Sequence, residues 1–342
     1  MTNKATYQRI AAETGISVAT VSRIFTGASN VKAETRQKVL TFLETAGYDT
    51  SLIHARENAQ SNRLLILNVP SIGNPFYTQI LHGAKTAALQ RGCHLFLNED
   101  HINDSTIGHF LDVLHKIHAA GLIITNHVPA PLLKRLSEEI PLVQCCEYDS
   151  SFDIPYVSID DVAAAKTGLE YLFSLGRKNI AFINGPIRYK YAKFRLKGYR
   201  DSLAAANIPF DPELVLQLPE ISYDLAISAV NNLFDSGKRP NGFFCASDVL
   251  AAAAIKASLR RGFSVPEDIA VVGFDNVDIS FMSTPTITTI SQPEYQLGLS
   301  SCELLVEHIT NPETPISNIL LATELIVRES STLRTALLNP AV

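Results

Sequence analysis

The sequence predicts an α/β protein in three parts: an all-helical head at residues 1–48, a polar linker at 49–63 and a larger body at 64–342. Two short helical stretches around a tight turn predict the head. Alternation of short β-rich apolar runs with amphipathic helical stretches predicts a body of doubly wound parallel sheets. With 342 residues, 46% of them hydrophobic, the chain can form two or three compact units.

Charge is divided unevenly along the chain. Residues 1–48 contain six Lys and Arg against three Glu, a net charge of +3, so the remaining residues carry −8 within the total of −5. Because Lys and Arg displace the counterions condensed on DNA, a basic head on an acidic body favours a DNA-binding module.

Residues 6–27 predict two short helices joined by a turn. Gly15 supplies the positive backbone angle of the turn, and the Ser17 side chain can accept a hydrogen bond from the free amides that open the second helix. Their apolar residues can meet in a small core: Ile10, Ala11, Ile16, Val21 and Ile24. A third helix is predicted at 33–46, with one apolar face formed by Val39, Leu40 and Leu43.

Three short helices with this turn form a helix-turn-helix, in which the N-terminal residues of the second helix face base edges. By that geometry Val18 and Ala19 face the major groove, and Arg23 can reach a guanine or a phosphate. Thr20 and Ser22 lie near the phosphates or the groove wall. Periodicity alone gives equal weight to a solvated helix of a small helical bundle.

The body is predicted to contain parallel sheets covered on both faces. Predicted strands cover residues 64–69, 94–98, 121–125, 142–144, 156–159, 179–184, 242–246 and 269–273. Predicted helices cover residues 76–90, 107–117, 160–175, 194–206, 226–235 and 248–261. Two sheets fit the length, and a ligand is expected at the carboxyl ends of the strands, between two lobes.

The head resembles that of the LacI/GalR family of repressors. The resemblance rests on SVATVSR at 17–23, preceded by IAAETGI and followed by ETR at 34–36 and GY at 47–48. It implies that Tyr7 and the start of the second helix contact phosphates, and that Val18, Ala19 and Arg23 read bases. The predicted DNA contacts are Thr6, Tyr7, Ser17, Val18, Ala19, Thr20, Ser22, Arg23 and Asn30.

Two positions of the head depart from the family pattern. Lys32 stands where the family has a Ser or Thr cap, which leaves Asn30 or water to serve the free amides of the third helix. Arg9 stands where the family has Asp, which adds positive charge near the DNA.

Residues 49–63 are a plain linker by composition. The resemblance implies a hinge helix that forms on DNA, pairs with its dimer mate and inserts a leucine into the minor groove. The ungapped match places Glu57 at that leucine position, so an apolar wedge requires a shifted register in which Leu52 or Ile53 takes the role. The predicted hinge residues are Leu52, Ile53, Ala55, Arg56 and Glu57.

The body also resembles this family, over nearly its whole length. The matching segments are SIGNPFY at 71–77, GP at 185–186, RLKGY at 195–199, ASD at 246–248, VPEDIAVVGFDN at 265–276 and PTITTISQP at 285–293. The resemblance implies a periplasmic-binding-protein-like fold, with lobe one at about 64–158 and 288–320 and lobe two at about 159–287 and 321–333. The stretch from about residue 195 onward is especially similar to a cytidine-responsive member.

The resemblance also implies an effector site between the lobes. Arg195 and Asp275 match the family's usual pair, in which a guanidinium fork donates to hydroxyls and a carboxylate accepts from them. Phe76 and Tyr77 match positions where aromatic rings stack on the effector. Further lining positions are matched by Asp160, Tyr189, Ser247 and Asp248. Taken singly, an Arg in a loop more often binds carbonyls, and an Asp after a strand more often caps a helix.

Other function classes have less support. His115 and His118 have a metal-ligand spacing but no accompanying cluster, and no catalytic constellation has a recognisable local signature, so we expect neither an enzyme nor a metal site, and no cofactor. No long apolar run and no export signal is visible, which favours a cytoplasmic protein over a periplasmic solute-binding protein and predicts no membrane contact. The five cysteines are expected to be reduced thiols, since the adjacent pair Cys145 and Cys146 allows only a strained bridge.

The combined expectation is a sequence-specific transcription repressor. A homodimer places one head on each half-site of a pseudo-palindromic double-stranded operator. A small effector, with a sugar preferred over a nucleoside, binds between the lobes and changes operator affinity; we expect release from DNA, although the residues leave corepression open.

Overall fold

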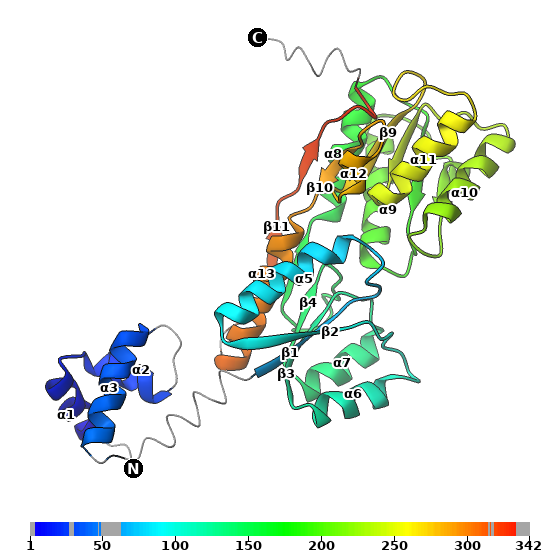
Figure 1. The fold of residues 1–342 in the computed structure, drawn as a ribbon. Coiled ribbons are helices and arrows are strands. Elements are labelled where there is room, and N and C mark those ends of the chain that lie inside the picture. The colour runs from blue at the N-terminus through cyan, green and yellow to red at the C-terminus, as the bar shows by residue number, and fades with distance from the viewer. Residues whose placement is uncertain are drawn as a thin grey trace, which may run out of the picture.

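The structure is a computed structural model that describes residues 4–26, 31–46, 48, 63–313, 315 and 318–332 (Figure 1). The head consists of α1 (Lys4–Thr14), α2 (Val18–Thr26) and α3 (Ala33–Thr45). Gly15 has a φ of 70°, and the backbone N–H of Thr20 donates to Ser17 Oγ at 3.2 Å, so both predicted features of the turn are confirmed. No side chain caps α3 at Lys32, in line with the missing Ser or Thr.

The core of the head forms from the predicted apolar faces. Ile10 of α1, Val21 and Ile24 of α2, and Val39 and Leu43 of α3 are buried together. Leu40 joins this cluster, while Ala11 and Ile16 pack against it half-buried. Three helices that each offer only a few apolar residues can bury them only against one another, which fixes the angle of α2 to the rest of the head.

The first lobe of the body contains a six-stranded sheet of order β11-β5-β4-β3-β1-β2, in which all neighbours are parallel. Its strands are β1 (Arg63–Asn68), β2 (Cys93–Asn98), β3 (Ala119–Ile124), β4 (Leu142–Cys145), β5 (Tyr156–Ile159) and β11 (Ile319–Leu321). Its helices are α5 (Phe76–Gln90), α6 (Ile107–Lys116), α7 (Ala130–Glu139) and α13 (Glu294–Thr310).

Strand alternation explains why helices cover both faces of this sheet. In β1, Leu65 and Leu67 join the core that contains residues of α5 and α13, whereas Ile66 joins a separate core with α6 and α7. Successive side chains of a strand point to opposite faces, so a strand whose central residues are all apolar, such as β1, needs a cover on each side. Figure 1 shows α5 and α13 on one side of the sheet and α6 and α7 on the other.

The second lobe contains a six-stranded sheet of order β12-β10-β9-β8-β6-β7, parallel except that β12 pairs antiparallel with β10. Its strands are β6 (Ile180–Asn184), β7 (Val215–Gln217), β8 (Gly242–Cys245), β9 (Ala270–Asp275), β10 (Thr288–Ser291) and β12 (Glu324–Ile326). Its helical segments are α8 (Asp161–Ser174), α9 (Lys190–Ala205), η1 (Pro212–Leu214), α10 (Tyr223–Asp235), α11 (Asp248–Arg260) and α12 (Ile279–Met282). The predicted α/β class, with a helical head and two parallel-sheet lobes, is confirmed.

The chain crosses between the lobes after β5, after β10 and between β11 and β12 within the described part of the body. The predicted return to lobe one at residue 288 is wrong, because Thr288–Ser291 pairs with β9 in the second sheet. The return occurs at residues 292–293, and α13 then packs against α5. The sequence of residues 287–290 does not itself indicate which of the two similar sheets this strand joins.

Helices α5 and α13 cross at two glycines. A Cβ atom on Gly83 would meet the backbone of Tyr295 and Leu299, and a Cβ atom on Gly298 would meet the carbonyl of Ile80. The two backbones can approach this closely only without side chains at the crossing. This contact supports α5, whose first residues face the space between the lobes.

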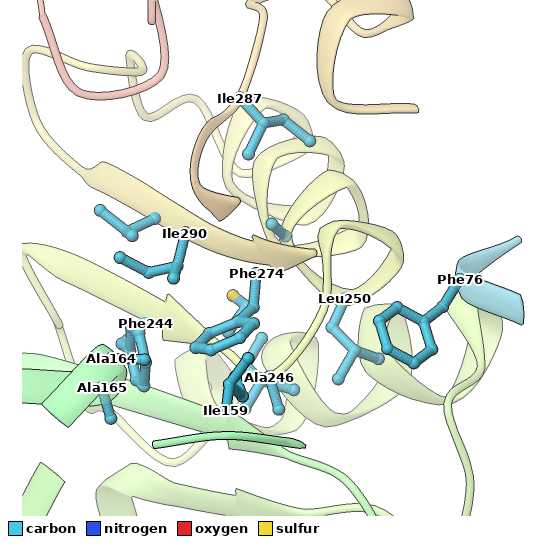
Figure 2. Close-up of a cluster of buried hydrophobic side chains, with 14 of the residues drawn as sticks. Phe76, Ile159, Ala164, Ala165, Phe244, Ala246, Leu250, Phe274, Ile287 and Ile290 are labelled. Atoms are coloured by element: carbon cyan, nitrogen blue, oxygen red, sulfur yellow. The ribbon is translucent and has the colours of Figure 1, made fainter. Parts of the chain in front are cut away.

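Buried side chains of both lobes belong to one apolar cluster. Figure 2 shows part of it, with Phe76 and Ile159 from the first lobe and Phe244, Leu250 and Phe274 from the second. This continuous core lies next to the segments that cross between the lobes. It supports the loops that carry polar residues into the space between the lobes. No helix among the described residues has both the length and the apolar character needed to span a bilayer.

Candidate DNA interface and effector cleft

The exposed face of α2 carries the predicted base-reading residues. Val18, Ala19 and Arg23 are exposed, and Val18 keeps 39% of its surface in solvent although it is apolar. Ser17 is exposed at the start of the helix, where its hydroxyl also contacts the hydroxyl of Thr20 at 2.8 Å. The opposite face of α2 is buried in the core of the head, so the exposed face is the one that can enter a DNA groove.

The remaining predicted DNA contacts have mixed positions. Tyr7 is half-buried, with its ring centroid 5.0 Å from that of Phe25, so α2 holds the Tyr7 ring in place. Ser22 is also half-buried. Thr6 lies in α1, but its side chain is outside the described part of the structure. Asn30 and the predicted hinge residues Leu52, Ile53, Ala55, Arg56 and Glu57 are outside the described residues as well.

Replacing Arg23 with alanine is expected to reduce binding to the specific operator by about 5- to 150-fold, which corresponds to ~1–3 kcal/mol for one base-reading contact. Binding to random duplex should fall much less, because phosphate contacts supply non-specific affinity. A titration of both duplexes at one salt concentration measures the two losses. Equal losses would mean that Arg23 contacts only phosphate.

A cleft of about 900 Å³ lies between the two lobes, at the carboxyl ends of the strands. Six of the predicted effector residues line it: Phe76, Tyr77, Tyr189, Arg195, Ser247 and Asp275. They come from loops and helix starts that follow β1, β6, β8 and β9. Parallel strands present their carboxyl ends at one edge of the sheet, so these separated segments converge there.

The other two predicted effector residues do not line the cleft, and these assignments are corrected. Asp160 caps α8, where its side chain accepts hydrogen bonds from the N–H groups of Val162 and Ala163 at 3.0 Å, and its neighbour Asp161 lines the cleft instead. Asp248 is fully buried, and its Oδ2 accepts from the N–H groups of Asn276 and Val277 at 2.7 and 3.0 Å. It therefore holds the loop that follows β9.

Arg195 is the centre of a buried charged cluster. Its Nε donates to Asp161 Oδ1 at 2.9 Å, and one terminal nitrogen donates to the carbonyl of Ala246 at 2.7 Å. The guanidinium carbon lies 3.4 Å from the ring centroid of Phe274, and the same terminal nitrogen is 3.9 Å from Asp275 Oδ1. The predicted pair of Arg195 and Asp275 is thus brought together, with Arg195 fixed by contacts on several sides.

Asp275 has an unusual backbone and an unusual pKa. Its φ of 102° and the φ of 70° at Asn276 lie in the region that residues with side chains rarely adopt, and such strain is often found at binding sites. Burial raises the pKa of Asp275 to about 7, although Arg195 and the hydrogen bond from Gln292 oppose this shift. The carboxyl group can therefore accept or donate a hydrogen bond near neutral pH.

Three residues form a polar contact across the lobes, called here the interlobe contact: Glu147 after β4, Ser158 in β5 and Lys190 at the start of α9. Glu147 accepts hydrogen bonds from the backbone N–H groups of Lys190 and Tyr191 at 2.6 and 3.1 Å. The Lys190 ammonium donates to Ser158 Oγ at 2.8 Å and lies 2.8 Å from Asp161 Oδ2. A carboxylate at a helix N-terminus satisfies amides that lack a partner within the helix.

The charges of the interlobe contact and of Asp161 beside it stabilise one another. Burial lowers the pKa of Lys190, but Asp161 and Glu147 outweigh burial and hold it above the usual value. Burial raises the pKa of Asp161, but Lys190 and Arg195 outweigh burial and hold it below the usual value. For Glu147, burial prevails over Lys190 and keeps its pKa raised. These groups thus depend on their partners to remain charged inside the protein.

Aromatic rings line the cleft from both lobes. Tyr189 and Tyr191 stack with ring centroids 5.6 Å apart, and the guanidinium carbon of Arg195 lies 4.9 Å from the Tyr191 ring. Phe76 and Tyr77 contact each other edge to face, with centroids 5.2 Å apart. Aromatic faces combined with fixed polar groups suit a ligand with an apolar ring face and hydroxyls at its rim.

Several residues at the cleft are not among the predicted effector residues: Glu147, Asp161 and Tyr191 line it, and Lys190 lies beside it, paired with Asp161. The sequence predicts a helix from residue 194, whereas α9 begins at Lys190, so the first turn of α9, with its aromatic and charged groups, lies outside the predicted helix. Two tyrosines on either side of Lys190 were the available signal. Among the described residues, no group of three or more His, Cys, Asp or Glu side chains could hold a metal ion.

Comparisons with known proteins find similar proteins for both the head and the body of the chain. Residues 6–51 match the family described as "Bacterial regulatory proteins, lacI family", and residues 169–331 match the "Periplasmic binding protein-like domain". Catabolite control protein A of Priestia megaterium is 30% identical over 315 residues, covering 91% of this chain and 94% of that protein. The HTH-type transcriptional repressor CytR of Escherichia coli (strain K12) is 28% identical over 330 residues, covering 96% of each.

Solved structures give the same result. The complex of the transcriptional regulator CelR with cellobiose superimposes with a TM-score of 0.72 at 29% identity, over 95% of this chain and 99% of that one. The Lac repressor dimer bound to operator shares the fold, with a TM-score of 0.73 at 24% identity over 94% of this chain and 97% of that one. With a matching head, a matching body and a 30% identical relative along nearly all of its length, this chain belongs to the LacI family and is a DNA-binding transcription regulator.

Proposed function

We propose that this protein is a cytoplasmic homodimeric repressor that a neutral carbohydrate releases from a pseudo-palindromic operator. The observation that carries the proposal is the cleft itself, which combines stacked tyrosines with the buried pair of Arg195 and Asp275. Its volume of about 900 Å³ accommodates more than a single sugar ring. A solved complex of CelR with the sugar cellobiose has the same fold, which supports a sugar here.

The charges of the cleft favour a neutral ligand over a phosphorylated one. Its acidic lining residues are Glu99, Asp100, Glu147, Asp161, Glu220 and Asp275, and its basic ones are Arg188 and Arg195. Arg195 already faces two carboxylates, so it has little positive charge left to offer a phosphate. Hydroxyl groups, in contrast, can donate to the carboxylates and accept from the guanidinium.

The proposed mechanism couples the cleft to the heads through lobe closure. A ligand held by Phe76 and Tyr77 of one lobe and Tyr189 and Arg195 of the other binds the closed arrangement more tightly than the open one. Closure moves residue 63, where the linker enters the first sheet, relative to its dimer mate. The proposed dimer face includes α5 and β2, where Leu89 and Phe96 leave 62% and 58% of their surfaces exposed.

A thermal-shift series with the purified protein tests the effector class. Cellobiose, ribose, a phosphorylated hexose and cytidine are added separately, and binding to the native state raises the unfolding temperature. We expect a rise with a neutral sugar and none with the phosphorylated hexose. A rise with cytidine alone would replace the sugar by a nucleoside, and a rise with the phosphorylated hexose alone would contradict the charge argument. Operator binding with and without the hit then gives the sign of regulation.

A further inference from the structure

The thiols of Cys145 and Cys146 lie side by side at the wall of the cleft, with their sulfur atoms 3.6 Å apart. Adjacent residues of a strand point to opposite faces, which would separate the two sulfurs. Here β4 ends at Cys145, and Cys146 has a φ of 67°. The N–H of Glu147 donates to the carbonyl of Cys145 at 2.8 Å, which closes a γ-turn of the rare positive-φ kind and turns the second thiol back beside the first.

Contacts on both sides hold this turn. The backbone N–H of Cys146 donates to the carbonyl of Val157 at 2.9 Å, and the carbonyl of Cys146 accepts from Ser158 Oγ at 2.8 Å. Cys146 is partly exposed and lines the cleft, whereas Cys145 is fully buried behind it. Small reagents that enter the cleft therefore meet one thiol directly, with a second thiol in contact behind it.

The surroundings favour thiol chemistry at this pair. The hydrogen bond from Cys146 lowers the pKa of Cys145 despite burial, and the Lys190 ammonium contributes in the same direction. The same hydrogen bond and burial raise the pKa of Cys146. The first proton of the pair is therefore lost at a lower pH than from an ordinary cysteine, and the second at a higher pH, with the remaining proton shared between the two sulfur atoms. The other described cysteines are buried; burial raises the pKa of Cys302, for example, to about 12.

We propose that Cys145 and Cys146 form an oxidisable dithiol that peroxide entering the cleft converts to a vicinal disulfide. With the shared proton on Cys145, the Cys146 thiolate attacks hydrogen peroxide and becomes a sulfenic acid; the hydroxide released takes the proton from Cys145 and leaves as water. The Cys145 thiolate then attacks the Cys146 sulfur and expels hydroxide, which takes up a proton from solvent as a second water. Two thiols are oxidised and one peroxide is reduced. The sulfurs close from 3.6 Å to a bond of about 2.05 Å.

Disulfide formation acts on the interlobe contact through the chain itself. Glu147 directly follows Cys146, and its carboxylate bonds the first amides of α9 in the other lobe. Formation of the disulfide rotates the γ-turn, and the Glu147 carboxylate moves with the turn. The oxidised protein therefore loses part of the contact between its lobes. This consequence does not depend on which effector the cleft binds.

Intact-mass analysis after one equivalent of hydrogen peroxide tests the chemical step. We expect wild-type protein to lose two hydrogen masses, with the disulfide located in the peptide that contains both cysteines and reversed by dithiothreitol. Cys145→Ser and Cys146→Ser should instead gain oxygen or remain unchanged, and Cys302→Ala should behave as wild type. Phenylarsine oxide, which needs two thiols to bind with loss of water, should label wild type and Cys302→Ala only. A wild-type protein that gains oxygen, stays unoxidised or pairs other cysteines would overturn the proposal.

The unfolding temperature tests the structural step. Oxidation should lower it by a few degrees in wild type, because the interlobe contact is weakened. Glu147→Gln can accept fewer hydrogen bonds from α9, so its reduced form should already unfold at a lower temperature and oxidation should lower it little further. Equal falls in both proteins, or no fall in either, would show that the disulfide forms without moving Glu147.

Discussion

Replacing Lys190 with methionine is expected to lower the free energy of unfolding by about 3–5 kcal/mol. The ammonium is 7% exposed and lies between Asp161 and Ser158, with Glu147 nearby. Methionine fills a similar space but leaves two buried carboxylates with less compensating charge. Chemical denaturation of the wild type and the variant measures the difference, and the fall should be accompanied by a raised pKa of Asp161.

Lys197→Met provides the matched control on the same helix. Lys197 pairs with Asp201 at 2.6 Å, but 61% of the Lys197 side chain is exposed, so water screens the pair. Exposed pairs of this kind contribute about 0–1 kcal/mol. If the two substitutions cost the same, the burial of Lys190 does not have the energetic effect that we assign to it.

Replacing Asp275 with asparagine is expected to weaken effector binding by about 30-fold or more, which corresponds to ~2 kcal/mol or more for a buried charged hydrogen-bond partner. Asparagine keeps the size of the side chain and an oxygen for the Gln292 amide, which now donates to Asp275 at 2.7 Å. Operator affinity without effector should stay unchanged, because the head folds around its own core. A variant that still responds normally would remove Asp275 from the binding site.

The same substitution gives a pH dependence with a defined sign. The pKa of Asp275 rises on folding from 3.8 to about 7, so the native state binds the proton more tightly than the unfolded state. Its contribution to stability is fully present below the unfolded pKa and is lost as the pH rises through about 7. The stability of wild type relative to Asp275→Asn should therefore decrease over this interval. A constant difference would show that the carboxyl group is not held protonated.

The helices, the turn and the exposed residues of the head could be predicted from the sequence alone. Val39, Leu40 and Leu43 define an apolar helical face, and Gly15 with Ser17 defines the turn, because these signals depend on residues only a few positions apart. The alternation of short apolar strands with amphipathic helices predicted parallel sheets. The resemblance to the family implied that Arg195 and Asp275 belong to one site, and the structure brings them to within 3.9 Å.

Features that depend on contacts between distant segments could not be predicted from the sequence. Asp160 and Asp161 are adjacent acidic residues. The position of α8 determines that Asp160 caps the amides of this helix while Asp161 faces the cleft. The partner of Thr288–Ser291 depends on which sheet offers a free edge. The contact of Glu147 with α9 joins residues 43 positions apart across two lobes. No local sequence pattern predicts such a contact. It stabilises the protein only because burial removes the charged groups from water and leaves them to interact with one another.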